Sequence, residues 1–464
     1  MVKSYLAEEE LRQYLLRAAK EDGIQRQAGL FVGQCSPQKD YIFHAACTPN
    51  LNMSENDPGV GEASLGKWQK KETEWVVGHA RQLTRMLPGG LCVIGVFLLC
   101  ASEMEEDVQG ALRKMLFAVE HAVNANSLWK RGDDDVQERV AMHLCTKSKK
   151  SLTTLDRITV RSYDISDPKC NACPAEWKFQ SLHASRGTEL HCNLRVHLQI
   201  PCNRHCLSNI NQDLKTGLRA WAHDVMAGVC LINGSYRSDD DLLTGAQVKP
   251  GRGKGKRSGA IDPLLVTLLL PPRREQVADG QKAVPWYDGA LTLTGSLHCR
   301  AFVHCHKPCV GEALKALKRD IVSSLWTRCQ LLMEDLLIDE SGRRDVSLEQ
   351  GLVMPRRVFV PTPRVEFCDY LFGDESLADV TSRVKELLDH PVSEEQLDVS
   401  TETLAVLADM EQEDKCTEPS CLPRSNFPPP KLSTYRRLVR NRGHLAALLT
   451  AILAMGLFLL FFME

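Results

Sequence analysis

"LPGGLCVIGVFLLC", Leu87 to Cys100, is the stretch that decides the fold of this 464-residue chain. A Pro-Gly-Gly turn opens into a run of almost unbroken apolar residues, too short to cross a bilayer. A run of this length predicts a strand that is buried on both faces. Buried strands often present catalytic side chains at their ends, so the residues around Cys100 are the first candidates for a site.

The segments around this strand predict an α/β unit over residues 1–150. "AGLFVGQCS" and "DYIFHAAC" alternate apolar and polar residues in the manner of a hairpin. Helical spacing predicts one helix over 71–87 and a second helix that begins near Ser102. The apolar stripe expected on the first helix consists of Trp75, Val76, Leu83 and Leu87. Together these elements predict an α/β sandwich.

A second α+β unit is predicted over residues 151–392, and it contains an internal repeat. "LHCNLRVHLQIPC" (190–202) and "LHCRAFVHCHKPC" (297–309) are identical at seven of thirteen positions. Each stretch follows an apolar strand and precedes an amphipathic helix, which predicts a duplicated strand–strand–helix unit, with chance similarity as the alternative. The Gly-rich basic loop at 245–260 is predicted to be a solvated insertion, because such runs bury too little surface to become ordered.

"LAALLTAILAMGLFLLFFM", residues 445–463, contains no charged side chain. With a rise of ~1.5 Å per residue, a helix of this length spans about 28 Å, close to the hydrocarbon thickness of a bilayer. A core helix of this length rarely lacks a polar face, so the prediction is a transmembrane tail anchor. The residues expected to form the membrane anchor are Leu445, Leu448, Leu449, Ile452, Leu453, Leu457, Phe458, Leu459, Leu460, Phe461 and Phe462.

The charges around this segment predict its orientation. A basic juxtamembrane segment, 435–444, precedes the span, and no basic residue follows it. The topology-setting residues are Arg436, Arg437, Arg440 and Arg442. The positive-inside rule then keeps the N-terminal bulk in the cytosol, and no secretory signal is visible at the start of the chain. The stretch 393–434, acidic and then Pro-rich, is expected to be a tether, and the long Leu/Phe-rich span favours the endoplasmic reticulum membrane.

Two groups of residues have the spacing of zinc ligands. One is "HCH" at His304–His306, but on a strand its histidines point to the polar side and the neighbouring cysteines to the core, which disfavours zinc. The other consists of the pairs Cys170/Cys173 and Cys202/Cys206, and whether these bind metal stays open. In a reducing cytosol the eighteen cysteines are expected to be small buried hydrophobes or possible ligands, and not a disulfide framework. No cofactor is predicted.

Nucleophilic catalysis has two candidates, Cys35 and Cys47. A thiolate nucleophile needs a nearby histidine and a lowered pKa. His44 is near in sequence, but no orienting acid or oxyanion loop accompanies it. We therefore do not expect a cysteine hydrolase. The formal net charge of −2 also argues against nucleic acid as a partner.

The strand at the opening of this subsection resembles the ligand-bearing strand of metalloprotease-type MPN domains. Those domains have a Gly and two bulky residues before His-x-His-Pro, and here Gly95, Val96 and Phe97 stand at the corresponding places. The positions of the metal ligands and their support are occupied by Leu98, Cys100, Val108 and Ala111. An apolar side chain cannot donate a lone pair to Zn²⁺, so the resemblance implies a non-catalytic MPN-type domain, a class that commonly pairs with a related partner.

Blocks along the whole chain, among them "RMLPGGLCVIGVF", "LINGSYRSDDDLL" and "CDYLFGDES", resemble the odorant-response-abnormal four-like family. The resemblance runs in order over essentially residues 1–464. It implies a tail-anchored protein of the endoplasmic reticulum without catalysis of its own. It also implies two kinds of partner. In nematodes the family helps deliver odorant receptors, which are G-protein-coupled receptors, to cilia, and it binds and stabilises the protease that removes the ubiquitin-fold modifier (UFM).

The fold class expected from all these features is α/β (α+β). An MPN-like α/β sandwich precedes a second α+β domain with an internal duplication, and one transmembrane helix follows. The function expected is that of a membrane-tethered adaptor for the UFM protease or for receptor clients, since tethering raises local concentration. The alternative is a zinc or cysteine isopeptidase that acts on modifier conjugates itself, through "HCH", Cys35 or Cys47.

Overall fold

A computed structural model of the chain describes residues 2–402 with internal gaps. The gaps are residues 21–25, 38, 50–69, 102–105, 130, 133–134, 147–157, 183–186, 203–206, 244–262, 272–288, 305–307 and 341–351. The chain divides into two compact units, 1–411 and 412–464, and the second lies wholly outside the described residues.

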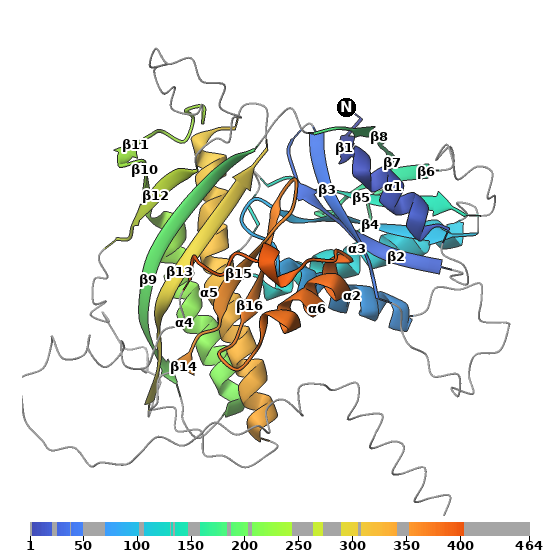
Figure 1. Cartoon of the computed structure of the whole chain (residues 1–464). Coiled ribbons are helices and arrows are strands. Elements are labelled where there is room, and N and C mark those ends of the chain that lie inside the picture. The colour runs from blue at the N-terminus through green and yellow to red at the C-terminus, as the bar shows by residue number, and fades with distance from the viewer. Residues whose placement is uncertain are drawn as a thin grey trace, which may run out of the picture. The chain divides into compact units, whose positions relative to one another are not determined.

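The first sheet has eight strands in the described part of the chain, in the order β7-β6-β5-β4-β2-β3-β1-β8 (Figure 1). The strands are β1 (Ser4–Glu8), β2 (Arg26–Gln34), β3 (Lys39–Cys47), β4 (Cys92–Cys100), β5 (Glu138–Cys145), β6 (Ile158–Asp164), β7 (Cys173–Pro174) and β8 (Glu176–Gln180). β4 lies inside the sheet, antiparallel to β2 and parallel to β5, with apolar clusters on both faces. The buried strand and the β2–β3 hairpin are therefore as predicted.

Helices cover both faces of this sheet. Helix α1 (Glu9–Ala18) packs on one face, and α2 (Lys70–Arg85), α3 (Glu106–Asn126) and α6 (Leu377–Leu388) contribute to the cluster on the other. The predicted stripe on α2 is wrong at Trp75, which is 43% exposed and donates its indole N–H to the carbonyl of Pro49. Val76 and Leu83 of the predicted stripe are buried, and His79 is buried with them, because the buried face is centred about one residue later along the helix than predicted.

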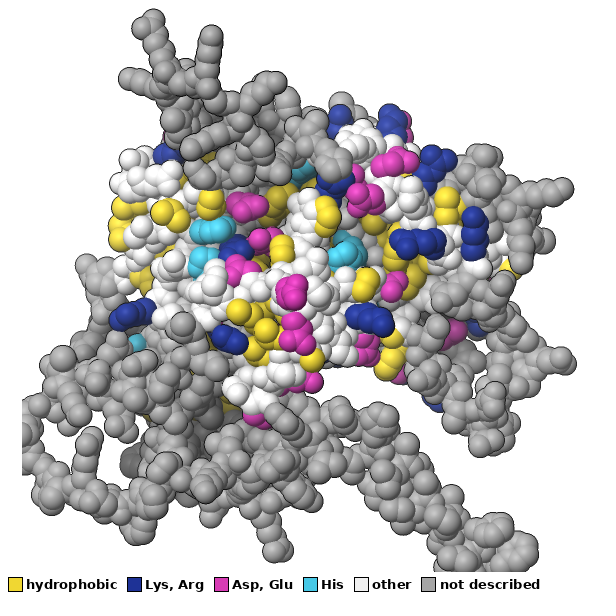
Figure 2. Space-filling view, in the orientation of Figure 1, with side chains coloured by type: hydrophobic (Ala, Val, Ile, Leu, Met, Phe, Trp, Pro, Cys, Tyr) yellow, Lys and Arg dark blue, Asp and Glu magenta, His cyan; other side chains and the backbone are white. Residues whose placement is uncertain are grey.

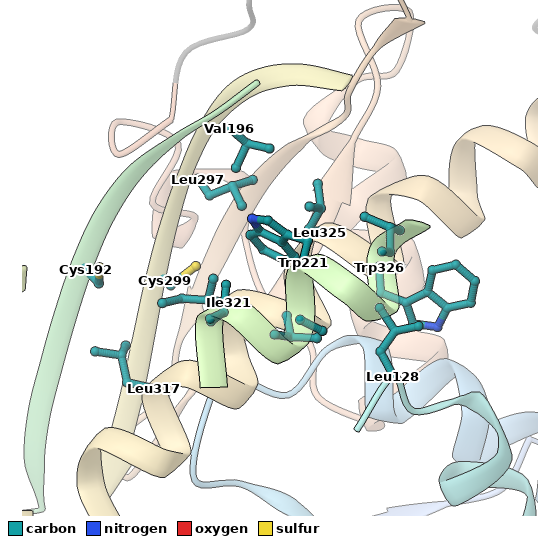
Figure 3. Close-up of a cluster of buried hydrophobic side chains, with 14 of the residues drawn as sticks. Leu128, Cys192, Val196, Trp221, Leu297, Cys299, Leu317, Ile321, Leu325 and Trp326 are labelled. Atoms are coloured by element: carbon teal, nitrogen blue, oxygen red, sulfur yellow. The ribbon is translucent and has the colours of Figure 1, made fainter. Parts of the chain in front are cut away.

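The second sheet has six strands within the described residues, in the order β11-β10-β12-β9-β13-β14. The strands are β9 (Thr188–Cys202), β10 (Val229–Ile232), β11 (Ser235–Tyr236), β12 (Leu264–Leu269), β13 (Gly289–Val303) and β14 (Leu352–Val353). β9 and β13 pair antiparallel along their whole length. Helices α4 (Leu207–Ala227) and α5 (Val310–Glu340) complete the core, and Figure 3 shows Trp221 and Ile321 near Leu297 and Cys299 of β13.

The internal repeat is present as two strand–helix pairs, β9–α4 and β13–α5. The predicted first strand of each copy is not repeated, because β6 joins the first sheet whereas β12 joins the second, next to β9. The predicted boundary at 150 also falls inside the first sheet. Strands β6 to β8 come after that position, and β8 pairs with β1 at the start of the chain.

A hairpin, β15 (Arg356–Pro361) with β16 (Glu366–Leu371), is followed by α6 and the short helix η3 (Glu394–Gln396). Asp398 and Phe359 exchange two backbone hydrogen bonds of 2.9 and 3.1 Å. Part of the stretch that the sequence assigns to the tether is therefore folded as far as Glu402, the last described residue, which is only 3% exposed. The rest of that stretch, from 403 to 434, lies outside the described residues.

Two ion pairs are buried between α5 and this C-terminal part. Both carboxylate oxygens of Glu402 accept from the Arg328 guanidinium at 2.8 Å. Asp320 accepts from two nitrogens of Arg357 at 2.7 and 2.9 Å. All four side chains are at most 2% exposed. Because a buried charge is tolerated only when it is paired and hydrogen-bonded, these pairs fix α5 against the hairpin and residues 398–402.

The Pro-Gly-Gly turn before β4 joins the first sheet to β13. Gly89 donates its N–H to the carbonyl of Arg300 at 3.0 Å and accepts from the N–H of Phe302 at 2.8 Å. Gly90 has φ +84°, and a Cβ added there would lie 2.0 Å from the carbonyl oxygen of Phe302. The turn from which the sequence predicts the start of β4 therefore also fixes the contact between the first sheet and β13 of the second sheet.

The mixed α/β class is confirmed, whereas the MPN-type arrangement stays a prediction. In the part of the chain that is described, no helix has the length and apolarity needed to cross a bilayer. The predicted span, 445–463, lies outside that part.

Gly90→Ala is expected to lower the free energy of unfolding of the full chain in detergent by about 1–3 kcal/mol, because the new Cβ meets backbone at a positive φ. Gly78→Ala is the matched control. It lies in α2 with no atom within 4 Å of the added Cβ, so its effect is expected to be neutral or stabilising by up to about 1 kcal/mol. Chemical denaturation measures both, and equal effects of the two substitutions contradict the role of the turn.

Glu402→Ala is expected to cost about 3–5 kcal/mol, because it leaves Arg328 buried without a counter-charge. The double substitution Arg328→Met with Glu402→Ala removes both charges and should recover part of that loss, while the backbone N–H groups of His298 and Arg357 still lose their acceptor. Denaturation of the wild-type chain, Arg328→Met, Glu402→Ala and the double variant gives the coupling energy. A double variant as unstable as the sum of the two single variants would show that the pair does not act as a unit.

Candidate functional site

A cavity of about 360 Å³ opens where β2 ends and β4 begins, between the first sheet and α5. The turn Leu87–Leu91 forms one wall, and the C-terminal ends of α2 and α3 contribute further side chains. Trp129 and Trp326 supply apolar surface, while arginines, a lysine and carboxylates supply charge. This volume is in the range of small-molecule pockets, which makes the cavity the first candidate for a binding site.

Glu120 of α3 holds two arginines at the cavity wall. Its Oε1 is 2.5 Å from Nε of Arg139, and its Oε2 is 3.1 Å from Nη2 of Arg131. Arg139 is 3% exposed. Burial alone lowers the pKa of Arg139, but Cys35 and Glu120 more than offset this and raise it. The guanidinium is thus a fixed positive charge at this end of the sheet.

Asp135, in the segment before β5, holds two cations of α5. Its carboxylate lies 2.9 Å from Nζ of Lys315 and 2.7 Å from Nη2 of Arg319. Burial raises the pKa of Asp135, but hydrogen bonds from Arg319 and Lys315 outweigh it and hold that pKa below its ordinary value. The carboxylate therefore stays ionised and connects the first sheet to α5 across the cavity.

Two thiols meet at the same end of the sheet. Sγ of Cys35, just after β2, lies 3.7 Å from Sγ of Cys92, the first residue of β4. The hydrogen bond between the two thiols lowers the pKa of Cys92 and raises that of Cys35. The nearby Arg139 guanidinium favours the thiolate form of both. Sequence reasoning considered Cys35 but missed Cys92, since nothing local shows which strand end lies beside β2.

The positions that correspond to MPN metal ligands form part of the core. Leu98 and Cys100 are 2% and 3% exposed and belong to the same apolar cluster as Val108 of α3, and Ala111 is also buried. Sγ of Cys100 lies 3.3 Å from Nε2 of His143 on β5, a contact that the sequence did not indicate. Both side chains of this contact are buried away from the cavity lining, so it is a core contact.

The candidate nucleophiles and His44 do not come together. Cys35 and Cys47 pack on the α1 face of the first sheet. The ring of His44, three residues before Cys47 on β3, points to the other face, where its Nε2 lies 2.7 Å from the carbonyl of Leu388. Cys47 and His44 thus lie on opposite faces, and Cys35 contacts a second thiol instead of an imidazole.

The "HCH" segment is described only at His304, because 305–307, including His306, lie outside the described residues. Cys299 points into the core, as the alternation on β13 predicted. The prediction that the histidines face a polar side is wrong, since His298 and His304 are 9% and 4% exposed. Phe359 of the hairpin covers His298, and Tyr41 lies against His304, so other layers bury the outer face of the strand.

The other predicted site residues are only partly described. Cys173 is exposed and Cys170 is half-buried, while the side chains of Cys202 and Cys206 lie outside the described residues. No group of three His, Cys, Asp or Glu side chains suited to a metal is found among the described residues. The membrane anchor, the four topology-setting arginines and the basic loop at 245–260 lie outside them.

Charged side chains on the visible face contact one another. Figure 2 shows histidine, arginine and acidic side chains gathered over β9, β13 and the hairpin. Arg300 of β13 pairs with Glu366 at 2.6 Å and with Asp398 at 2.9 Å, and its guanidinium carbon lies 3.7 Å from the centre of the Phe359 ring. These contacts hold the hairpin and the start of the tether on the sheet.

Acid is expected to destabilise the fold between about pH 6.5 and pH 4. Burial lowers the pKa of His44, His298 and His304 to about 4 each. Because the unfolded histidines keep a pKa of about 6.5, the unfolded state binds more protons in this window and stability falls as pH falls. Melting temperatures of the full chain from pH 7.5 downward measure this. His304→Phe, placed among aromatic rings, should reduce the slope, and an unchanged slope would contradict the assignment.

Comparison with solved structures finds a partial likeness to the crystal structure of UfSP from C. elegans. The match covers 84% of this chain and 57% of that chain, with a TM-score of 0.41 and 9% sequence identity. A score this low does not establish a common fold.

Comparison of sequences gives a much stronger result. The model of the odorant response abnormal 4-like family matches residues 29–399. The human protein odr-4 homolog is 36% identical over 463 residues, 98% of each chain. Odorant response abnormal protein 4 of Caenorhabditis elegans is 22% identical over 417 residues, covering 87% of this chain and 82% of its own. The chain therefore belongs to the odorant response abnormal 4-like family.

Proposed function

We propose that this chain is a tail-anchored adaptor of the endoplasmic reticulum membrane. Its folded part faces the cytosol, binds and stabilises the UFM-specific protease, and assists the localisation of a subset of G-protein-coupled receptors. It carries out no catalysis itself. The observation that carries the proposal is the full-length match to odr-4 homologues, which includes the tail as well as the folded part.

The extent of that match matters for the anchor. The alignment with the human homologue covers 98% of the 464 residues, which leaves about nine residues unaligned. The segment from 445 to the end has twenty residues, so much of it must be aligned. An uncharged run of nineteen residues that follows four arginines is the pattern of a membrane anchor with a cytosolic N-terminal side.

The receptor part of the proposal rests on the relatives. The C. elegans relative is named for an abnormal odorant response, and the family resemblance implies a part in odorant receptor delivery. The protease part rests on the family resemblance alone. Both parts require the same physical arrangement, a binding surface held at a membrane, and tethering raises the local concentration of a bound partner without any new contact.

The geometry of the described residues supports an adaptor over the isopeptidase alternative. Cys35 faces another thiol, and His44 lies on the opposite face of the sheet from Cys47. At the strand end where an MPN enzyme holds zinc, Leu98 packs in an apolar cluster. A cysteine or zinc hydrolase needs its nucleophile or metal beside a general base, and neither arrangement is formed by these residues.

Deletion of 445–464 is expected to move most of this chain, and most of the UFM protease bound to it, from membranes to the cytosolic fraction. The reason is that the uncharged run 445–463 has the apolar length needed to hold the chain in a bilayer. Fractionation of cells that express the full chain or the deletion, followed by immunoblotting of both proteins, measures the shift.

The matched control replaces 445–464 with an unrelated tail anchor of the same length, which should restore both proteins to membranes. If the deleted chain stays on membranes, the anchor is assigned wrongly. If the chain is released while the protease keeps its membrane fraction, the chain does not hold the protease and the adaptor proposal fails.

A further inference from the structure

We propose that Cys35 and Cys92 form a peroxide-reactive dithiol, a modification site at which hydrogen peroxide oxidises two cytosolic thiols to a reversible disulfide. This goes beyond the adaptor function, since it concerns a covalent change in the folded part itself.

The two sulfur atoms are already in contact. Cys35 and Cys92 are 57 residues apart in sequence, yet their Sγ atoms lie 3.7 Å apart. β2 and β4 are paired antiparallel, with Gly33 opposite Cys92, so the two cysteines occupy diagonal positions at the end of the ladder. A disulfide bond is about 2.05 Å long, so the two sulfur atoms must move closer together than their present 3.7 Å, with a shift of the side chains and of the strand ends that carry them.

A small oxidant can reach this pair. Both cysteines line the cavity of about 360 Å³ and are half-buried, whereas most other cysteines of the described core are fully buried. Hydrogen peroxide is small enough to enter a cavity of this size and reach both sulfur atoms.

The electrostatic surroundings favour Cys92 as the attacking thiolate. The hydrogen bond between the two thiols lowers the pKa of Cys92 and raises that of Cys35, and the positive charge of Arg139 lies close to both. Arg139 in turn is held by Glu120. Thiolates beside a cation and a hydrogen-bond donor are the ones that react with peroxide.

The chemistry balances in two steps. The Cys92 thiolate attacks one oxygen of hydrogen peroxide, the O–O bond breaks, and a sulfenic acid and hydroxide form. The Cys35 sulfur then attacks the Cys92 sulfur, and the S–O bond breaks as the S–S bond forms, releasing water. Two thiols lose two electrons and two protons, and the peroxide becomes two waters. A cytosolic thiol such as glutathione reverses the bond by exchange, as expected for a transient disulfide in that compartment.

A disulfide between Cys35 and Cys92 would lie next to the contact between the first sheet and β13 of the second sheet. Gln34, next to Cys35, donates to the carbonyl of Phe302 at 3.0 Å and accepts from the backbone N–H of His304 at 2.6 Å. Cys92 follows the turn in which Gly89 pairs with β13. Oxidation therefore joins two segments that each hold β13.

Cys192 and Cys299 provide a matched control within the same chain. They face each other directly across β9 and β13, but they are 2% and 0% exposed and burial raises the pKa of both. This second cysteine pair also lies on paired strands, but oxidants in solution cannot reach it. No nearby cation offsets the effect of burial on the pKa of either thiol.

The experiment treats the full chain in detergent micelles with graded hydrogen peroxide, blocks free thiols with N-ethylmaleimide, and identifies peptides by mass spectrometry without reduction. The expected product is a linked peptide pair containing Cys35 and Cys92, absent after reduction. Cys35→Ser should leave Cys92 as a sulfenic acid that dimedone captures. Dimedone present while the wild-type chain is oxidised should label Cys92 in preference to Cys35, because the thiolate is the reactive form. Cys192→Ser should leave the linked pair unchanged.

The proposal is overturned if the wild-type chain forms no such linked pair, a result that does not depend on how any variant folds. It is also overturned if Cys192 and Cys299 become linked at the same peroxide concentration, which indicates general oxidation. Stronger dimedone labelling at Cys35 than at Cys92 of the wild-type chain would overturn the assignment of the attacking thiolate.

Discussion

Two buried carboxylates, Asp320 and Glu402, hold the structure together. Each binds an arginine side chain through two contacts, Asp320 with Arg357 and Glu402 with Arg328, and each also accepts backbone N–H groups of neighbouring strands. A carboxylate removed from water costs several kcal/mol unless such donors surround it. The groups that donate hydrogen bonds to these two carboxylates come from α5, β13 and β15. Both carboxylates are therefore satisfied only when these three elements and the start of the tether are packed together. The ion pairs thus specify one arrangement of segments that are distant in sequence.

The cavity follows from the position of α5 that these pairs fix. The turn before β4 passes between β13 and α5, so closely that a Cβ at Gly89 would lie 2.5 Å from the carbonyl oxygen of Ala316. On the same helix Lys315 and Arg319 reach across to Asp135. The loop, the helix and the end of the first sheet therefore enclose a space whose walls are set by backbone contacts and ion pairs. Such walls keep their geometry better than walls of long, unpaired side chains.

Local periodicity was enough to predict most elements but not what covers them. The unbroken apolar run of β4 and the alternation of β2 and β3 identify strands, because side chains of a strand alternate between faces whatever lies beyond. The same alternation placed His298 on the outer face of β13 correctly, yet it could not show that the hairpin would bury that face. The pairs Cys35–Cys92 and Arg328–Glu402 join residues 57 and 74 positions apart, and no local pattern marks such partners. Composition likewise placed the start of the tether too early, because it did not indicate that Leu397 and Glu402 are buried among exposed polar residues.

The pairing of Glu402 bears on how an anchored adaptor works. Glu402 is the last residue that the structure describes, and its charge is matched by Arg328 inside the core. Displacing this residue requires separating a buried pair, at a cost of about 3–5 kcal/mol for the charge left alone. Displacement of Glu402 is therefore resisted by its ion pair with Arg328. A tether attached to an exposed loop would lack this resistance, because surface loops open at little cost. The buried pair thus makes the attachment of the tether part of the stability of the fold.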